Sequence, residues 1–182
     1  GIISDRLICN EEWDNMQTIL RPKVQGAWNL HCATLNKELE FFILFSSVTA
    51  VLGSMGVAGY AMGNSFMSGL TAYRRQLGLP SLCLNWGPWK EVGMLTRLGP
   101  IAQEIWTKNG FKTLSNKEGL QTFEAVKKQN GELSIMPVDW EKWCKQYPRD
   151  LIPDSIVDFA KSVGRNLLSN TGAGLEFVLS DG

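Results

Sequence analysis

The chain has 182 residues, of which 44% are apolar and 20% charged, so it can bury the core of one globular domain. Its 18 basic side chains balance 18 acidic ones, and a net charge of zero argues against nucleic acid or an anionic membrane as a partner. No apolar run approaches the roughly 18 residues that a membrane span needs, and no signal-peptide pattern opens the chain, so we expect a cytoplasmic protein.

The first part of the chain predicts a strand end followed by two helices. The apolar sequence GIISD of Gly1–Asp5 indicates the end of a strand, and residues 11–20 carry apolar side chains at helical spacing. Pro22 suits the first turn of a second helix, which continues through His31.

The middle of the chain predicts strands that alternate with helices. Residues 41–45 and 81–86 are short apolar runs, typical of strands that helices cover on both faces of a parallel sheet. A helical stripe over residues 64–77 lies between them. Residues 90–128 predict helices with loops, and residues 133–138 predict another strand.

This alternation predicts an α/β fold with a Rossmann-like, doubly wound parallel sheet. We assign residues 1–148 to that domain and predict a C-terminal helix or linker tail over residues 149–182, which become rich in Ser, Asn and Gly. The four cysteines lie far apart without a CxxC spacing, and His31 is the single histidine. We therefore expect reduced thiols, a structural His31 and no metal site.

Polar residues follow two of the predicted strands at the edge where parallel sheets collect their chemistry. Ser46 and Ser47 follow the first of these strands, and Gly87, Pro88 and Trp89 follow the second. Tyr60 and Asn64 stand four positions apart, a spacing that places two side chains on one face of a helix. Taken singly, each of these residues has an ordinary structural explanation.

Three segments, taken together, resemble the ketoreductase domain of modular type I polyketide synthases, a branch of the short-chain dehydrogenase/reductase family. They are RPKVQGAWNLH, IMPVDWEKW and LFSSVTAVLGSMGVAGYAMGNSFMSGLTAYRRQLGLPSLCLNWGPWKEVGM. The resemblance covers residues 1–147, and the segments occur in the family's order. It implies NADPH-dependent reduction of a β-ketoacyl group that phosphopantetheine carries on an acyl carrier protein.

The resemblance places the family's catalytic residues on Lys23, Ser47, Tyr60 and Asn64, with the family's spacing of thirteen from Ser47 to Tyr60 and four from Tyr60 to Asn64. A phenol of pKa about 10 is a poor acid near neutral pH, so a neighbouring lysine ammonium would help Tyr60 to donate its proton. Ser47 would orient the substrate carbonyl, and Asn64 would hold a water that resupplies the proton.

Further residues follow from the same resemblance. Lys23 and Tyr60 would also contact the cofactor, together with Gly87, Pro88 and Trp89, and the hydride would come from a nicotinamide. The substrate would contact three residues, Asp5, Met94 and Leu95, the last two at the start of the family's mobile lid.

The stereochemical markers of the family favour the B-type alcohol. Asp5 keeps the last residue of the B-type LDD motif, and Leu52 stands where A-type members carry tryptophan. Met55 and Gly59, however, replace the proline and asparagine that are usual in B-type members.

The sequence departs from the family at the cofactor site. A glycine-rich turn that cradles the pyrophosphate normally opens the domain, whereas the GSMGVAG of this chain has the spacing GxxGxxG. We therefore interpret the chain as the incomplete, C-terminal half of a short-chain dehydrogenase/reductase fold, with the upstream half of the same domain as a partner. The open strand edge at Gly1–Asp5 predicts either a homodimer or poor solubility.

Three hypotheses for the function remain open at this stage. The first is the β-ketoacyl reductase of a multidomain synthase, which the complete set of four catalytic residues favours. The second is a non-catalytic structural half-domain, which the absent pyrophosphate turn favours for this chain alone. The third is a free-standing reductase of small alcohols or fatty-acid intermediates, which the NWGPWKEVGM segment disfavours.

Overall fold

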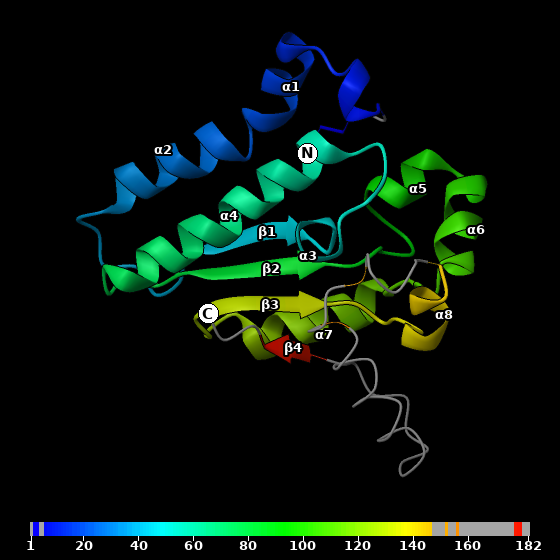
Figure 1. Ribbon diagram of the computed structural model, residues 1–182. Coiled ribbons are helices and arrows are strands. Elements are labelled where there is room, and N and C mark those ends of the chain that lie inside the picture. The colour runs from blue at the N-terminus through cyan, green and yellow to red at the C-terminus, as the bar shows by residue number, and fades with distance from the viewer. Residues whose placement is uncertain (1, 4–5, 147–151, 153–155, 157–176, 180–182) are drawn as a thin grey trace. The chain divides into compact units, whose positions relative to one another are not determined.

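The computed structural model describes residues 2–3, 6–146, 152, 156 and 177–179, and Figure 1 shows their helices and strands. The chain divides into two compact units. The first unit comprises Gly1–Trp86, Gln121–Ile135 and Phe177–Gly182, and the second comprises Gly87–Leu120 and Met136–Glu176. No helix among the described residues is long and apolar enough to span a membrane.

The first unit is built on a four-stranded sheet in the order β1-β2-β3-β4. Strands β1 (Ile43–Ser47), β2 (Leu82–Trp86) and β3 (Gly131–Ile135) are parallel, and Ile43 pairs with Leu82, which pairs with Gly131. Parallel neighbours joined through helices confirm the predicted α/β fold. The short strand β4 (Phe177–Leu179) pairs antiparallel with β3 and falls in the predicted tail, most of which lies outside the described residues.

The predicted strand over Gly1–Asp5 is not found in its described part. Ile2 and Ile3 have no strand geometry, and the other three residues lie outside the described residues. The Arg6 amide donates to the Gly56 carbonyl at 2.8 Å. The backbone after Ile3 is therefore hydrogen-bonded to a loop and not to a neighbouring strand. An apolar run becomes a strand only where a neighbouring strand can take up its backbone hydrogen bonds.

The helices of the first unit are a short 3₁₀ turn η1 (Ile8–Asn10), α1 (Trp13–Leu20), α2 (Val24–Thr34), the short α3 (Thr49–Leu52) and α4 (Ala58–Gln76). The 19-residue α4 crosses the sheet, with α1 and α2 beside it (Figure 1). It buries Met67 and Leu70 against Phe42 and Leu44 of the sheet region and Ala27 of α2. This apolar cluster holds the helix on the strands.

Helix α4 begins six residues before the stripe that the sequence predicts. Its first buried positions are Gly59, Gly63 and Asn64, and none of these is apolar and large enough to mark a helical face. The sequence pattern therefore becomes visible only from Asn64 onward.

The second unit consists of short helices and turns. Its helices are α5 (Met94–Leu98), α6 (Pro100–Lys108) and α8 (Trp140–Cys144). Helix α7 (Asn116–Val126) belongs to this unit up to Leu120 and to the first unit from Gln121. Trp106 of α6 packs on Phe111 with ring centroids 4.7 Å apart. Asp139 caps α8 by accepting a hydrogen bond from the Lys142 amide at 3.0 Å. These helices and loops confirm the prediction for residues 90–128.

A buried guanidinium joins the ends of α2 and α4. Arg74 is fully buried, lies over the Phe42 ring at 3.7 Å and donates to the Pro80 carbonyl at 3.2 Å. Its Nη1 lies 3.2 Å from Nδ1 of the buried His31. Burial and the guanidinium charge both lower the pKa of His31, so the imidazole is neutral and accepts this hydrogen bond.

We predict that this contact makes the stability of the chain pH-dependent. The folded-state pKa of His31 lies below its unfolded value of about 6.5, so the stabilisation is present above pH 6.5 and is lost as the pH falls through the lowered pKa. Urea unfolding between pH 7.5 and 5 measures the effect. His31→Gln, which keeps an acceptor for Arg74 but does not titrate, is expected to flatten this part of the profile; an unchanged profile would contradict the assignment.

Candidate active site

Four of the predicted site residues lie in the first unit, around the N-terminal half of α4. Lys23 is the residue immediately before α2, Ser47 ends β1, and Tyr60 and Asn64 lie one turn apart on α4. Ten residues, including α3, separate β1 from α4, and the end of the strand lies against the helix because Ser46 donates to the Asn64 carbonyl at 3.5 Å. Ser47 thus lies at the carboxyl end of a strand of the parallel sheet, close to the first turns of α4.

Lys23 is the electrostatic centre of this group. Its Nζ lies 5.1 Å from the centroid of the Tyr60 ring, and the ion pairs among the described residues do not include it. Burial lowers the pKa of Lys23 to about 8, an effect that the nearby Cys83 partly offsets. A half-buried ammonium without a carboxylate beside it favours negative charge on whatever group approaches it.

The position of Lys23 depends on a glycine of α4. A Cβ placed on Gly63 would lie 3.2 Å from Cδ and 3.3 Å from Cβ of Lys23, which is tighter than ordinary contact. A side chain at residue 63 would therefore push the lysine stem away by a few tenths of an ångström, and glycine permits the close approach. Gly63 is one position before Asn64 and was not predicted as part of the site.

Asn64 is fully buried and holds the first turns of α4 to the loop after β1. Its Nδ2 donates to the Tyr60 carbonyl at 2.9 Å and to Thr49 Oγ1 at 3.4 Å. The acceptor on Tyr60 fixes the orientation of the amide, which leaves Oδ1 without a partner among the described residues. This buried oxygen can accept a hydrogen bond from a water or a bound molecule.

The two serines at the end of β1 have different surroundings. The buried Ser46 donates to the Asn64 carbonyl at 3.5 Å, so it joins the strand to the helix. The half-buried Ser47 accepts a hydrogen bond from the Thr49 amide at 3.3 Å. Ser47 therefore belongs to the same loop as the residues that contact Asn64, while its hydroxyl can still donate to another group.

The remaining predicted residues lie elsewhere. Gly87, Pro88, Trp89, Met94 and Leu95 belong to the second unit, and Asp5 lies outside the described residues. Trp89 pairs with Leu114 in an isolated bridge, and its indole fills the space beside Gly119, where a Cβ would overlap it. Met94 is half-buried and Leu95 is buried.

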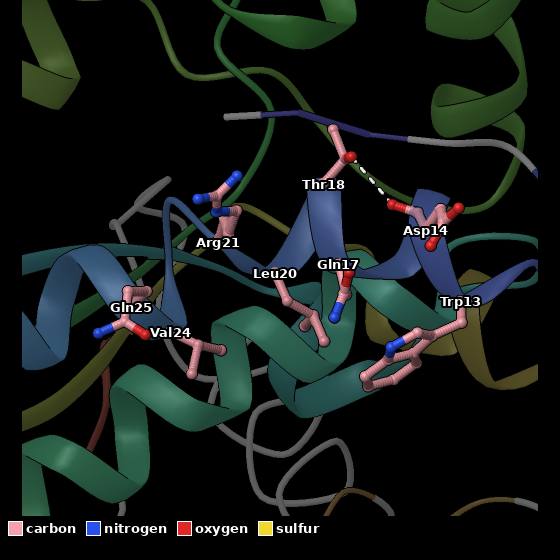
Figure 2. A pocket seen from close by; sticks show the side chains of 8 residues that line it. All are labelled: Trp13, Asp14, Gln17, Thr18, Leu20, Arg21, Val24 and Gln25. Atoms are coloured by element: carbon pink, nitrogen blue, oxygen red, sulfur yellow. Dashed lines mark hydrogen bonds between the residues drawn. The ribbon is translucent and has the colours of Figure 1, made fainter.

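A groove between α1 and the start of α2 was not predicted. Figure 2 shows its lining side chains, which are Trp13, Asp14, Gln17, Thr18, Leu20, Arg21, Val24 and Gln25. Thr18 donates to the Asp14 carbonyl at 2.9 Å, and the Trp13 side chain is 67% exposed. None of the proposed catalytic residues lines this groove.

A family model described as the KR domain matches residues 1–91, which is half of the chain. The chain belongs to the KR domain family. Curated relatives of this KR chain are polyketide synthases, and the solved structures that it resembles are ketoreductase domains.

Three of these proteins show the extent of the likeness. A phenolphthiocerol/phthiocerol polyketide synthase of Mycobacterium tuberculosis is 31% identical over 148 residues, 81% of this chain and 6% of that protein. The spectinabilin polyketide synthase system protein NorB of Streptomyces orinoci is 39% identical over 127 residues, 69% of this chain and 6% of that protein. The ketoreductase from the first module of phoslactomycin biosynthesis in Streptomyces sp. HK803 is 28% identical, with a TM-score of 0.75 over 84% of this chain and 35% of that one.

The KR chain thus spans about a third of that solved ketoreductase and a small part of the synthases. The match of the fold extends over 84% of the chain.

We predict that Gly63→Ala displaces Lys23 without destabilising α4. The new methyl group forces the lysine stem away from the helix, solvent reaches the ammonium, and the Lys23 pKa rises from about 8 toward 10.5. Titration of ε-¹³C-labelled lysine by NMR measures this change. Gly69→Ala on the same helix, where nothing lies within 4 Å of a new Cβ, is the control and should leave Lys23 unchanged. Equal titration of Lys23 in both variants would rule out the close packing.

Proposed function

We propose that this KR chain carries the catalytic residues of a β-ketoacyl reductase, which uses NADPH to reduce a β-keto group that phosphopantetheine presents on an acyl carrier protein. Membership of the KR domain family supports the reaction class. The single observation that carries the proposal is the half-buried Lys23 ammonium, 5.1 Å from the Tyr60 ring centroid and without a salt bridge among the described residues.

Tyr60 acts in this proposal as the proton donor. A ketone that accepts a hydride becomes an alkoxide, which must gain a proton as its charge develops. An ammonium beside the phenol stabilises the phenolate that remains after proton transfer, and the low dielectric of a half-buried site strengthens the attraction. Lys23 supplies this charge because neither a carboxylate nor a thiolate neutralises it: Cys83 keeps its proton, since burial raises the pKa of that thiol to about 11.

Ser47 and Asn64 have supporting roles. The Ser47 hydroxyl ends strand β1 and can donate to the substrate carbonyl oxygen, which orients the ketone and stabilises the developing charge. Asn64 Oδ1 is buried and without a partner among the described residues, so it can hold a water that returns a proton to Tyr60. Both residues are held by the same loop through Thr49.

The residues present fit the nicotinamide end of NADPH. The Lys23 ammonium, which forms no ion pair among the described residues, can donate hydrogen bonds to the ribose hydroxyls. Gly87, Pro88 and Trp89 are proposed to line the nicotinamide ring. When bound, the nicotinamide supplies the hydride. We propose that the upstream half of the same domain supplies the contacts to the pyrophosphate, because this chain spans about a third of a solved ketoreductase.

The substrate is proposed to contact Met94 and Leu95 at the start of α5, and also Asp5, which lies outside the described residues. The residues at positions 5 and 52 favour a B-type alcohol product. A non-catalytic structural half-domain is the alternative function.

We predict that Tyr60→Phe abolishes reduction. The assay measures NADPH oxidation with a β-ketoacyl thioester, using this chain together with the upstream half of the domain. Loss of the proton donor is expected to lower kcat by about 10²- to 10⁴-fold. Tyr73→Phe is the matched control, since Tyr73 lies exposed on the same helix and should retain full activity. Equal activity of the Tyr60→Phe variant and the wild type would contradict the role of Tyr60 as proton donor, and no activity in the reconstituted wild type would favour the structural half-domain.

We also predict that activity falls as the pH rises above about 8. The Lys23 pKa is lowered to about 8, so the ammonium that assists Tyr60 is lost above that pH, whereas an ordinary lysine would keep its charge beyond pH 10. Above pH 8, the value of kcat/KM should fall about tenfold per pH unit. Lys23→Arg retains its charge, so in this variant the fall should begin at a higher pH. A fall that still begins near pH 8 in this variant would show that another group causes it.

A further inference from the structure

The catalytic face of α4 continues one turn beyond Asn64. Tyr60, Asn64 and Ser68 stand four positions apart, a spacing that aligns side chains along one face of a helix. Ser68 is half-buried, and its hydroxyl donates to Glu132 Oε1 on β3 at 2.8 Å. The helix that carries the proposed catalytic residues is therefore hydrogen-bonded to a strand far from them in sequence.

Glu132 is held on its other side by β2. The fully buried Asn85 donates to the same Oε1 at 2.6 Å, and its Nδ2 also lies 3.4 Å from Ser134 Oγ. One carboxylate oxygen thus receives donors from both α4 and β2. Two charge-assisted hydrogen bonds to one atom are strong and directional, so they fix the distance between the helix and the strand.

A thiol connects this group to the site. Cys83 is fully buried, and its Sγ lies 3.8 Å from Ser68 Oγ and 4.0 Å from Asn85 Oδ1. The same thiol interacts with Ser46, which bonds to the Asn64 carbonyl, and with the charge of Lys23. We call Ser68, Cys83, Asn85 and Glu132 the polar seam under α4.

The polar seam lies beside the apolar core. Its Cys83 belongs to the same cluster as Met67 and Leu70 of α4 and Leu44 of β1. Glu132 is half-buried, and the ion pairs among the described residues do not include it. Its two hydrogen bonds therefore compensate for the hydration that the carboxylate gives up at this position. Hydrogen bonds between fixed partners specify one arrangement of the helix and the strands, whereas apolar contacts are not directional.

We propose that Glu132 is a positioning residue for the active site: through Ser68 and Asn85 it fixes the register of α4 on the sheet, and with it the alignment of Tyr60 and Lys23. A reacting geometry tolerates errors of well under an ångström, and directional hydrogen bonds specify the position of a helix more narrowly than apolar contacts do. The inference deepens the proposed function and rests on it for its catalytic meaning.

The test uses the Lys23 titration in the intact chain, followed by NMR of ε-¹³C-lysine, because the lysine stem packs on α4 at Gly63 and reports the position of the helix. The ionisable groups that face Lys23 are Tyr60 on α4 and Cys83 on β2. Glu132→Ala deletes both hydrogen bonds, and we expect the Lys23 midpoint to rise from about 8 by about one pH unit as solvent enters. Glu132→Gln keeps an oxygen acceptor and should restore the midpoint to about 8.

Two further variants complete the design. Ser68→Ala removes one donor only and should raise the midpoint even if Glu132→Ala does not fold. Glu124→Ala, at an exposed carboxylate of α7, is the control and should leave the midpoint unchanged. Folded Glu132→Ala and Ser68→Ala chains that keep a Lys23 midpoint near 8 would overturn the proposal, as would a Glu132→Gln chain that shifts as far as the alanine variant. The titration requires no turnover, so an inactive reconstituted reductase would refute the proposed function and leave this inference standing.

Discussion

The burial of Lys23 against helix α4 is the interaction on which the site depends. A lysine on an exposed helix end has a pKa that is too high and a charge that is too well screened to influence a phenol. Here the stem lies on Gly63 and Nζ lies beside the Tyr60 ring, so the same contact brings the two groups together and removes water from them. The missing side chain at Gly63 thus contributes to the burial that lowers the pKa of Lys23.

The surroundings of Lys23 are arranged so that its charge is not cancelled. The charge of Cys83 would act on Lys23, but burial raises the pKa of that thiol to about 11, and the seam carboxylate of Glu132 accepts hydrogen bonds from Ser68 and Asn85. A carboxylate next to Lys23 would have stabilised the ammonium but would also have reduced its effect on Tyr60. The interior therefore provides polar support for α4 without a competing anion at the lysine.

The sequence predicts the α/β architecture and three of the strands, because short apolar runs and helical stripes are governed by burial. Strand β1 lies two residues later than the predicted run, and β3 begins two residues earlier. The proposed catalytic residues Lys23, Ser47, Tyr60 and Asn64 also come from the sequence, although only through their joint occurrence in a family pattern. Gly63, Cys83 and Glu132 were not predicted as parts of the site. Their contacts join residues that are far apart in sequence, such as Ser68 and Glu132, and no local pattern records such a pair. The start of α4 was missed for a related reason, since glycine and asparagine occupy its first buried positions.

The contact between Arg74 and His31 has a mechanical consequence for the other end of α2. Lys23 stands immediately before that helix and His31 lies eight residues further on, about 12 Å along the axis. Because Arg74 ties His31 and Thr34 to the backbone at Pro80, the far end of α2 cannot swing away from the sheet. An α-helix of this length is stiff, so holding its His31 end restricts the directions in which its Lys23 end can move. Substitutions around Arg74, remote from any reacting atom, would relax this restraint and change the position of the Lys23 ammonium.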